Sequence, residues 1–119
     1  MSSSRPPPPL KIKLPFTPQS ALTVLEWGAS PNSSPYCHKD ISLWCDGFWC
    51  QYIDVDAAPE IESLLPILAE VETQWDLYLA NTFALEELRS RSFDDVRLPT
   101  EWFSEWLRQA RTALHAANS

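Results

Sequence analysis

Three cysteines and two histidines are the residues of this 119-residue chain with the most distinctive chemistry. Cys37, Cys45 and Cys50, together with His38, have the residue types of a zinc site made of three thiolates and one imidazole. Their spacing contains no C-x-x-C pair, which favours buried free thiols over zinc. A Cys45–Cys50 disulfide is not expected in a chain that we predict to be cytoplasmic. We therefore predict no metal and no cofactor.

Cys37, His38 and His115 are the candidates for nucleophilic catalysis. A thiol and its base must lie within hydrogen-bonding distance, but neighbouring side chains of an extended segment, such as Cys37 and His38, point apart. The chain has only two glycines, and it contains no Gly-rich phosphate loop, no HExxH and no G-x-S-x-G motif. We predict no catalytic residue and keep an enzyme that uses these three residues as an alternative.

The carboxylates are unevenly distributed along the sequence. Residues 40–88 hold eleven Asp and Glu residues and no Lys or Arg, in a chain whose net charge is −7. Such a field repels nucleic acid and anionic membranes and attracts basic partners. The alternative interpretation is an acidic surface that only keeps the protein soluble.

Residues 41–55 carry the strongest local signal, and it predicts a β-hairpin. Asp46 and Gly47 have the types of a favoured two-residue turn. That turn would place Trp44 opposite Trp49 on the less apolar face, either as binding anchors or as a covered second core layer. Acidic residues follow the hairpin directly. The predicted partner-binding residues are therefore Trp44, Asp46, Trp49, Asp54, Asp56, Glu60 and Glu62.

The remaining elements support a small sheet with helices on one face. Residues 10–16 alternate apolar and polar residues, which predicts an edge strand. Thr17 and Pro18 then begin a helix that we expect to end with Gly28 in a left-handed conformation. Asp56 is the expected cap of the next helix, which Pro66 should kink or split in two.

The last third of the chain is predicted less sharply. Residues 75–80 fit a short strand or a continued helix, and we favour the strand, followed by a helix over residues 83–91. Pro99 and Thr100 begin a final helix with one wide apolar stripe. The fold class is therefore α+β, with a small antiparallel sheet centred on the 41–55 hairpin and three to four helices packed against it. We expect residues 1–9 to be a disordered Pro-rich tail and residues 10–119 to form a single domain.

Charge, size and the missing catalytic motifs favour a binding protein. Our leading hypothesis is an inhibitor that neutralises a basic protein partner, like an immunity protein or antitoxin, with a nuclease effector as one such partner. The alternative is a chaperone or adaptor for a secreted or assembling client. The chain has no apolar run of transmembrane length and no apolar leader, so we expect a cytoplasmic protein that binds neither nucleic acid nor membrane.

Overall fold

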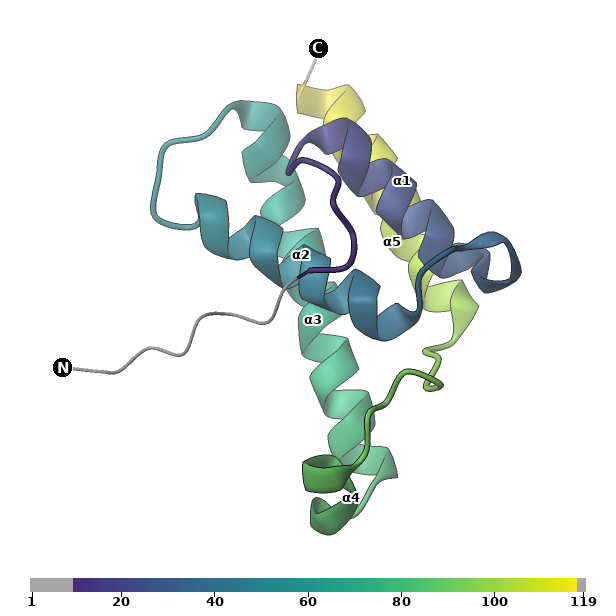
Figure 1. Ribbon diagram of the computed structural model, residues 1–119. Coiled ribbons are helices and arrows are strands. Elements are labelled where there is room, and N and C mark those ends of the chain that lie inside the picture. Colours follow the sequence, from purple (N-terminus) through teal and green to yellow (C-terminus); the bar gives the residue numbers. More distant parts are fainter. Residues whose placement is uncertain (1–9, 118–119) are drawn as a thin grey trace, which may run out of the picture.

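The computed structural model describes residues 10–117, and every regular element in that part of the chain is helical (Figure 1). In chain order the elements are α1 (Pro18–Ala29), the 3-10 turn η1 (Pro31–Ser33), α2 (His38–Tyr52), α3 (Pro59–Thr82), α4 (Leu85–Ser90) and α5 (Thr100–Ala117). The predicted α+β class is wrong, because residues 10–117 contain no strand and hence no sheet. The expected tail, residues 1–9, lies outside the described residues.

Residues 41–55 form helix α2 and the turn after it, not a hairpin. Ile41, Trp44, Cys45 and Phe48 stand at positions i, i+3, i+4 and i+7, and all four side chains are fully buried. The hairpin would have placed Trp44 on the less apolar face, whereas the helix places it in the core. The helical spacing therefore brings these four side chains into the core, and the Asp46-Gly47 pair lies inside the helix.

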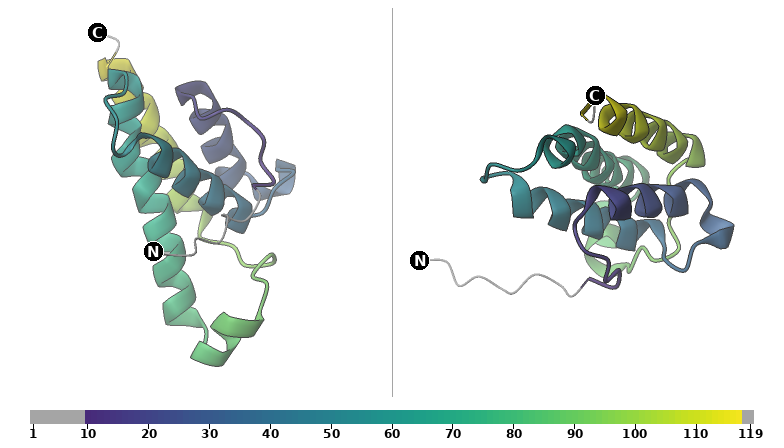
Figure 2. Two further views of the ribbon diagram at one scale, coloured as in Figure 1. Left: turned by 60° about the vertical axis from the view of Figure 1, so that its left-hand side comes forward. Right: turned by 90° about the horizontal axis from the view of Figure 1, so that it is seen from above.

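Two helix pairs and their connections build the core. Helices α1 and α5 lie side by side and run in opposite directions, while α2 packs on α3, and α3 also packs on α5 (Figures 1 and 2). Gly28 lies within α1, not at a left-handed end as predicted. A Cβ atom at this position would overlap the Phe103 ring, so glycine allows α1 and α5 to approach closely.

Helix α3 is continuous over 24 residues although Pro66 lies inside it, so the helix is not split. Pro59 occupies the first turn, and Ala58 is the N-cap where Asp56 had been predicted. The predicted strand at 75–80 is wrong, since these residues continue α3 and bury Trp75 and Leu79. The second half of α3 extends away from the other long helices and ends next to α4 (Figures 1 and 2).

Several helix boundaries were predicted correctly. Thr17 caps α1, because its hydroxyl accepts a hydrogen bond from the Ser20 amide at 3.2 Å, and Pro18 is the first helical residue. Helix α5 begins at Thr100, directly after Pro99, and its stripe contributes Phe103, Trp106, Leu107 and Ala110 to the core. Helix α4 falls within the predicted 83–91 segment.

His38 ties three parts of the fold together. Its side chain is 1% exposed. The Nε2 atom lies 3.0 Å from the Gly28 carbonyl oxygen, and Nδ1 accepts a hydrogen bond of 2.8 Å from the Leu98 amide. The ring is therefore neutral, with its proton on Nε2. Burial, followed by the nearby charge of Arg97, lowers the pKa of His38.

Candidate functional site

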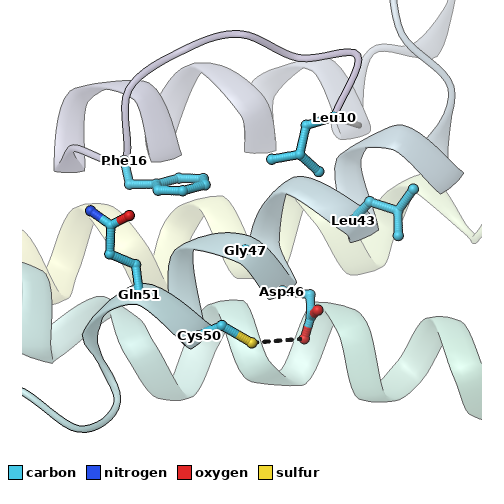
Figure 3. Close-up of a pocket in the computed structure, with 7 residues that line it drawn as sticks. All are labelled: Leu10, Phe16, Leu43, Asp46, Gly47, Cys50 and Gln51. Carbon is cyan, nitrogen blue, oxygen red and sulfur yellow. Dashed lines mark hydrogen bonds between the residues drawn. The ribbon is translucent and has the colours of Figure 1, made fainter. Parts of the chain in front are cut away.

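A pocket of about 400 Å³ opens between residues 10–16 and the outer side of α2 (Figure 3). Leu10 and Phe16 cover it from the N-terminal segment, and helix α2 supplies the opposite wall. Most of this wall is apolar, with a single carboxylate at its edge. The complete lining is Leu10, Phe16, Leu43, Asp46, Gly47, Cys50 and Gln51.

The 10–16 segment is held on α2 through its backbone. Trp44 Nε1 donates a hydrogen bond to the Leu14 carbonyl oxygen at 3.2 Å, and the Tyr52 hydroxyl donates one to the Phe16 carbonyl oxygen at 3.0 Å. The segment is not a strand, but the predicted division of its faces is confirmed: Ile12 is buried, Leu14 and Phe16 are partly buried, and the lysines point to solvent. Trp44, which is buried, and Tyr52, which is partly buried, thus fix the roof of the pocket.

Gly47 sets how closely this roof approaches the helix. A Cβ atom at position 47 would lie 3.0 Å from Phe16 Cζ and 3.4 Å from Leu10 Cδ1. The Phe16 ring in turn packs against Trp44 and Phe48, with ring centroids 5.3 and 5.7 Å away. The glycine that had indicated a hairpin turn therefore makes room for the covering segment.

A smaller hollow of about 180 Å³ lies between α2 and α3, and Asp46 borders both cavities. Its other lining residues are Trp49 from α2 and Ala69, Glu72 and Thr73 from α3. Trp49 is partly buried, so part of its ring remains accessible. An indole and two carboxylates around one hollow are a favourable setting for a cation.

Carboxylates crowd this hollow. A hydrogen bond with the Asp76 side chain, partial burial and the negative charges of Asp76 and Asp46 raise the pKa of Glu72 to about 7. The Cys50 thiol lies 3.8 Å from Asp46 Oδ1, and its pKa is also raised, first by burial and then by the Asp46 charge. Each nearby anion makes the next ionisation harder, so a bound cation would relieve this repulsion.

The carboxylates of this region have no cationic partner in the described part of the chain. The ion pairs within residues 10–117 use Glu26, Glu87, Asp94, Asp95 and Glu105. None of them uses a carboxylate of α2, the 53–58 connection or α3. The following residues form no ion pair with Lys, Arg or His there: Asp46, Asp54, Asp56, Glu60, Glu62, Glu70, Glu72 and Asp76.

The predicted binding residues divide into three groups. Asp46 and Trp49 line the same hollow. Asp54 and Asp56 are exposed in the 53–58 connection, while Glu60 and Glu62 lie in the first turn of α3, where negative charge also stabilises a helix end. Trp44 is fully buried, so it is a core residue and offers no surface to a partner.

The sequence pattern did not reveal the apolar pocket or the lining that α3 supplies to the hollow. Glu72 and Asp76 are four residues apart, a spacing that places both on one face of a helix. Asp46 and Cys50 have the same spacing on α2. A helical interpretation of residues 41–55 and 75–80 would have brought these residues together, whereas the hairpin separated them.

Of the three residues considered for catalysis, His38 and Cys37 are held in other interactions. Both ring nitrogens of His38 are bonded to backbone groups, so this residue is not available as a base. The Cys37 thiol lies 3.3 Å from Asp40 Oδ2, and burial raises its pKa, which disfavours the thiolate. No group of three His, Cys, Asp or Glu residues in this range could hold a metal ion.

None of the helices within residues 10–117 combines the length and the apolar character needed to cross a bilayer. Comparisons of the chain with protein-family models, with curated proteins and with solved structures find no match in any of the three. The geometry and charge of the chain itself are therefore the observations that bear on its function.

Proposed function

We propose that this chain is an acidic binding protein that neutralises a basic protein partner, in the manner of an immunity protein or antitoxin. The observation that carries the proposal is the set of eight carboxylates on α2, the 53–58 connection and α3 that no cation within residues 10–117 compensates. Unpaired carboxylates repel one another, which costs stability, and a partner that supplies Arg and Lys recovers this cost on binding.

Steered association favours a partner that itself binds polyanions. An enzyme that acts on nucleic acid needs a basic surface to hold the phosphates, and a compact acidic surface competes for it. A nuclease effector is a partner of this chemistry. The proposed inhibitor would cover the basic surface of the effector and exclude its substrate.

The test begins with the chain immobilised as bait in a lysate of its native cells. A four-fold variant, Asp46→Asn, Asp54→Asn, Asp56→Asn and Glu62→Gln, neutralises the candidate surface. A matched control, Asp94→Asn, Asp95→Asn, Glu86→Gln and Glu101→Gln, has the same net charge but changes carboxylates outside it. We expect a basic protein that elutes with moderate salt from the wild type and the control, and that the four-fold variant does not retain.

Two measurements on that protein complete the test. Four charge pairs at the surface contribute about 1–4 kcal/mol in total, so the four-fold variant should bind the purified partner about fivefold or more weakly at low salt. The difference should shrink in 1 M salt, where the Debye length is about 3 Å. The partner's own activity should fall when this chain is added. Equal affinity of the four-fold variant and the control would contradict the proposal.

A chaperone or adaptor for a secreted or assembling client is the second candidate, and the apolar pocket on α2 favours it. A client of this kind would be bound in an unfolded form and would resist elution by salt. A folded basic partner released by salt is the outcome that separates the inhibitor from the chaperone.

A further inference from the structure

We propose that the α2 pocket and the neighbouring Asp46–Glu72 hollow form one two-part site, which recognises a segment of the partner where an arginine adjoins a leucine- or phenylalanine-sized side chain. This inference rests on the proposed function and specifies which feature of a basic partner is recognised. Charge alone attracts many basic proteins, whereas two adjoining cavities of different character select among them.

The apolar part is a formed cavity. Its volume of about 400 Å³ lies within the range of about 300–1,000 Å³ that ligand pockets usually have. Leu10 and Phe16 close it from above, and Leu43 and Gly47 form much of the helix wall (Figure 3). The hydrogen bonds from Trp44 and Tyr52 hold its roof in place, so little ordering is needed when a side chain enters.

The polar part fits a guanidinium group. Asp46 and Glu72 supply acceptors from two different helices, and the partly exposed Trp49 ring supplies an aromatic face. A planar guanidinium both stacks on an indole and donates several hydrogen bonds to carboxylates, which a lysine ammonium does not do equally well. The crowding of Asp46, Glu72 and Asp76 favours a cation at this position.

Asp46 joins the two parts, because it lines both cavities. Consecutive Cα atoms are about 3.8 Å apart, and a bound segment that turns at this point directs two neighbouring side chains into adjoining cavities. Beyond Gln51 the surface continues into the 53–58 connection, where Ile53 and Val55 are 42% and 52% exposed and alternate with two aspartates. The surrounding surface therefore repeats the same combination of apolar and acidic groups.

Short capped peptides test the two parts separately. Three tetrapeptides carry leucine–arginine, leucine–citrulline or serine–arginine at their centre, and amide chemical shifts of the ¹⁵N-labelled chain report binding. Leucine–arginine should shift the amides of Gly47, Gln51 and Glu72 together. Losing either the buried leucine or the charge should weaken binding about fivefold or more. Equal binding of all three peptides, or equal binding of the two leucine peptides, would overturn the two-part site.

Matched variants locate the binding. Cys50→Trp fills the apolar part from an exposed position, and Thr112→Trp adds the same side chain at an exposed position on α5. We expect Cys50→Trp, with an otherwise unchanged amide spectrum, to weaken the leucine–arginine peptide about tenfold, and Thr112→Trp to have no effect. Glu72→Gln should weaken the arginine peptides and leave leucine–citrulline unchanged. A folded Cys50→Trp protein that binds as the wild type does would overturn the inference.

The captured basic partner separates this inference from the proposed function. If the four-fold charge variant loses the partner and Cys50→Trp retains it fully, the proposed function stands and the two-part site fails. If no basic partner binds in a salt-dependent way while the leucine–arginine peptide binds as described, the proposed function fails and the site stands.

Discussion

Replacing His38 tests whether this buried ring stabilises the fold by linking α2 to α1 and to the segment at Leu98. The ring is buried, its Nδ1 accepts a hydrogen bond from the Leu98 amide, and its Nε2 donates one to the Gly28 carbonyl. Its centroid also lies 4.4 Å from that of the Phe103 ring. Two substitutions separate these contributions: His38→Phe keeps an aromatic ring of similar size and removes both hydrogen bonds, whereas His38→Ala removes the ring as well.

The magnitudes follow from the groups left without partners. A buried donor or acceptor that loses its partner costs about 1–3 kcal/mol, so two such groups predict a loss of about 2–6 kcal/mol for His38→Phe. The lost ring contact and the cavity should raise the loss for His38→Ala by roughly 1–2 kcal/mol more. The free energy of unfolding is measured at pH 7.5 by urea titration, with the fluorescence of the six tryptophans as the probe.

The pH dependence gives a second, independent readout. The pKa of His38 is lowered in the folded protein, so just below the ordinary value of about 6.5 the unfolded chain binds a proton that the folded chain does not. The wild type should therefore lose up to about 1.4 kcal/mol of stability per pH unit as the pH falls through this window. His38→Phe lacks this dependence, so the stability gap between the two proteins should narrow from pH 7.5 to pH 5.

One result would refute the reasoning. If His38→Phe unfolds within about 0.5 kcal/mol of the wild type at pH 7.5, as surface substitutions do, the two hydrogen bonds do not stabilise the fold. A stability gap that stays constant between pH 7.5 and pH 5 would show that the histidine does not titrate as its burial requires.

Three further changes have defined outcomes. Gly28→Ala forces a methyl group against the Phe103 ring, so the midpoint of thermal unfolding should fall by an amount that corresponds to about 1–3 kcal/mol, and an unchanged midpoint would contradict the close approach of α1 and α5. Glu72→Gln removes a group whose pKa is raised to about 7; because the folded state holds that proton more tightly, the variant should be more stable than the wild type at pH 8 and similar at pH 4, and urea titration at both values checks the sign. Tyr52→Phe removes the hydrogen bond to the Phe16 carbonyl and should cost about 1 kcal/mol, with faster hydrogen exchange near the 10–16 segment.

The sequence predicted correctly the two helix starts that depend on local signals alone. Thr17, Pro18, Pro99 and Thr100 act locally, since a cap or an N-terminal proline affects only the first turn, and each was assigned correctly. Gly28 was misassigned because its role is a contact with Phe103, which lies 75 residues away in the sequence. Local signals could not reveal that contact.

Residues 41–55 show why the fold class was wrong. The pattern fits both periods: the hairpin uses Asp46-Gly47 as a turn, and the helix uses the spacing of Ile41, Trp44, Cys45 and Phe48. Only the tertiary structure decides between them, because the helix buries Trp44 against the 10–16 segment. The strand predicted at 75–80 came from a separate signal, the alternation of apolar and polar residues there, which the helix also accommodates.

The sequence indicated that the candidate site is acidic, but it did not reveal the apolar pocket. The unequal distribution of carboxylates can be read from the sequence. Asp46 and Trp49, which line the hollow, were among the predicted binding residues. The pocket requires Leu10 and Phe16 to cover α2, which depends on hydrogen bonds between residues 30 and 36 positions apart. The sequence pattern of either segment alone carries no sign of that pairing.

The hydrogen bonds that hold the 10–16 segment have a consequence for how this protein can evolve. Trp44 and Tyr52 donate to main-chain oxygens of the segment, and every amino acid supplies such an oxygen. Substitutions at position 10, or at the exposed positions 11 and 13, therefore leave these attachments intact. The lining of the pocket can therefore change through mutations in its cover, such as at position 10, while the helical scaffold stays the same.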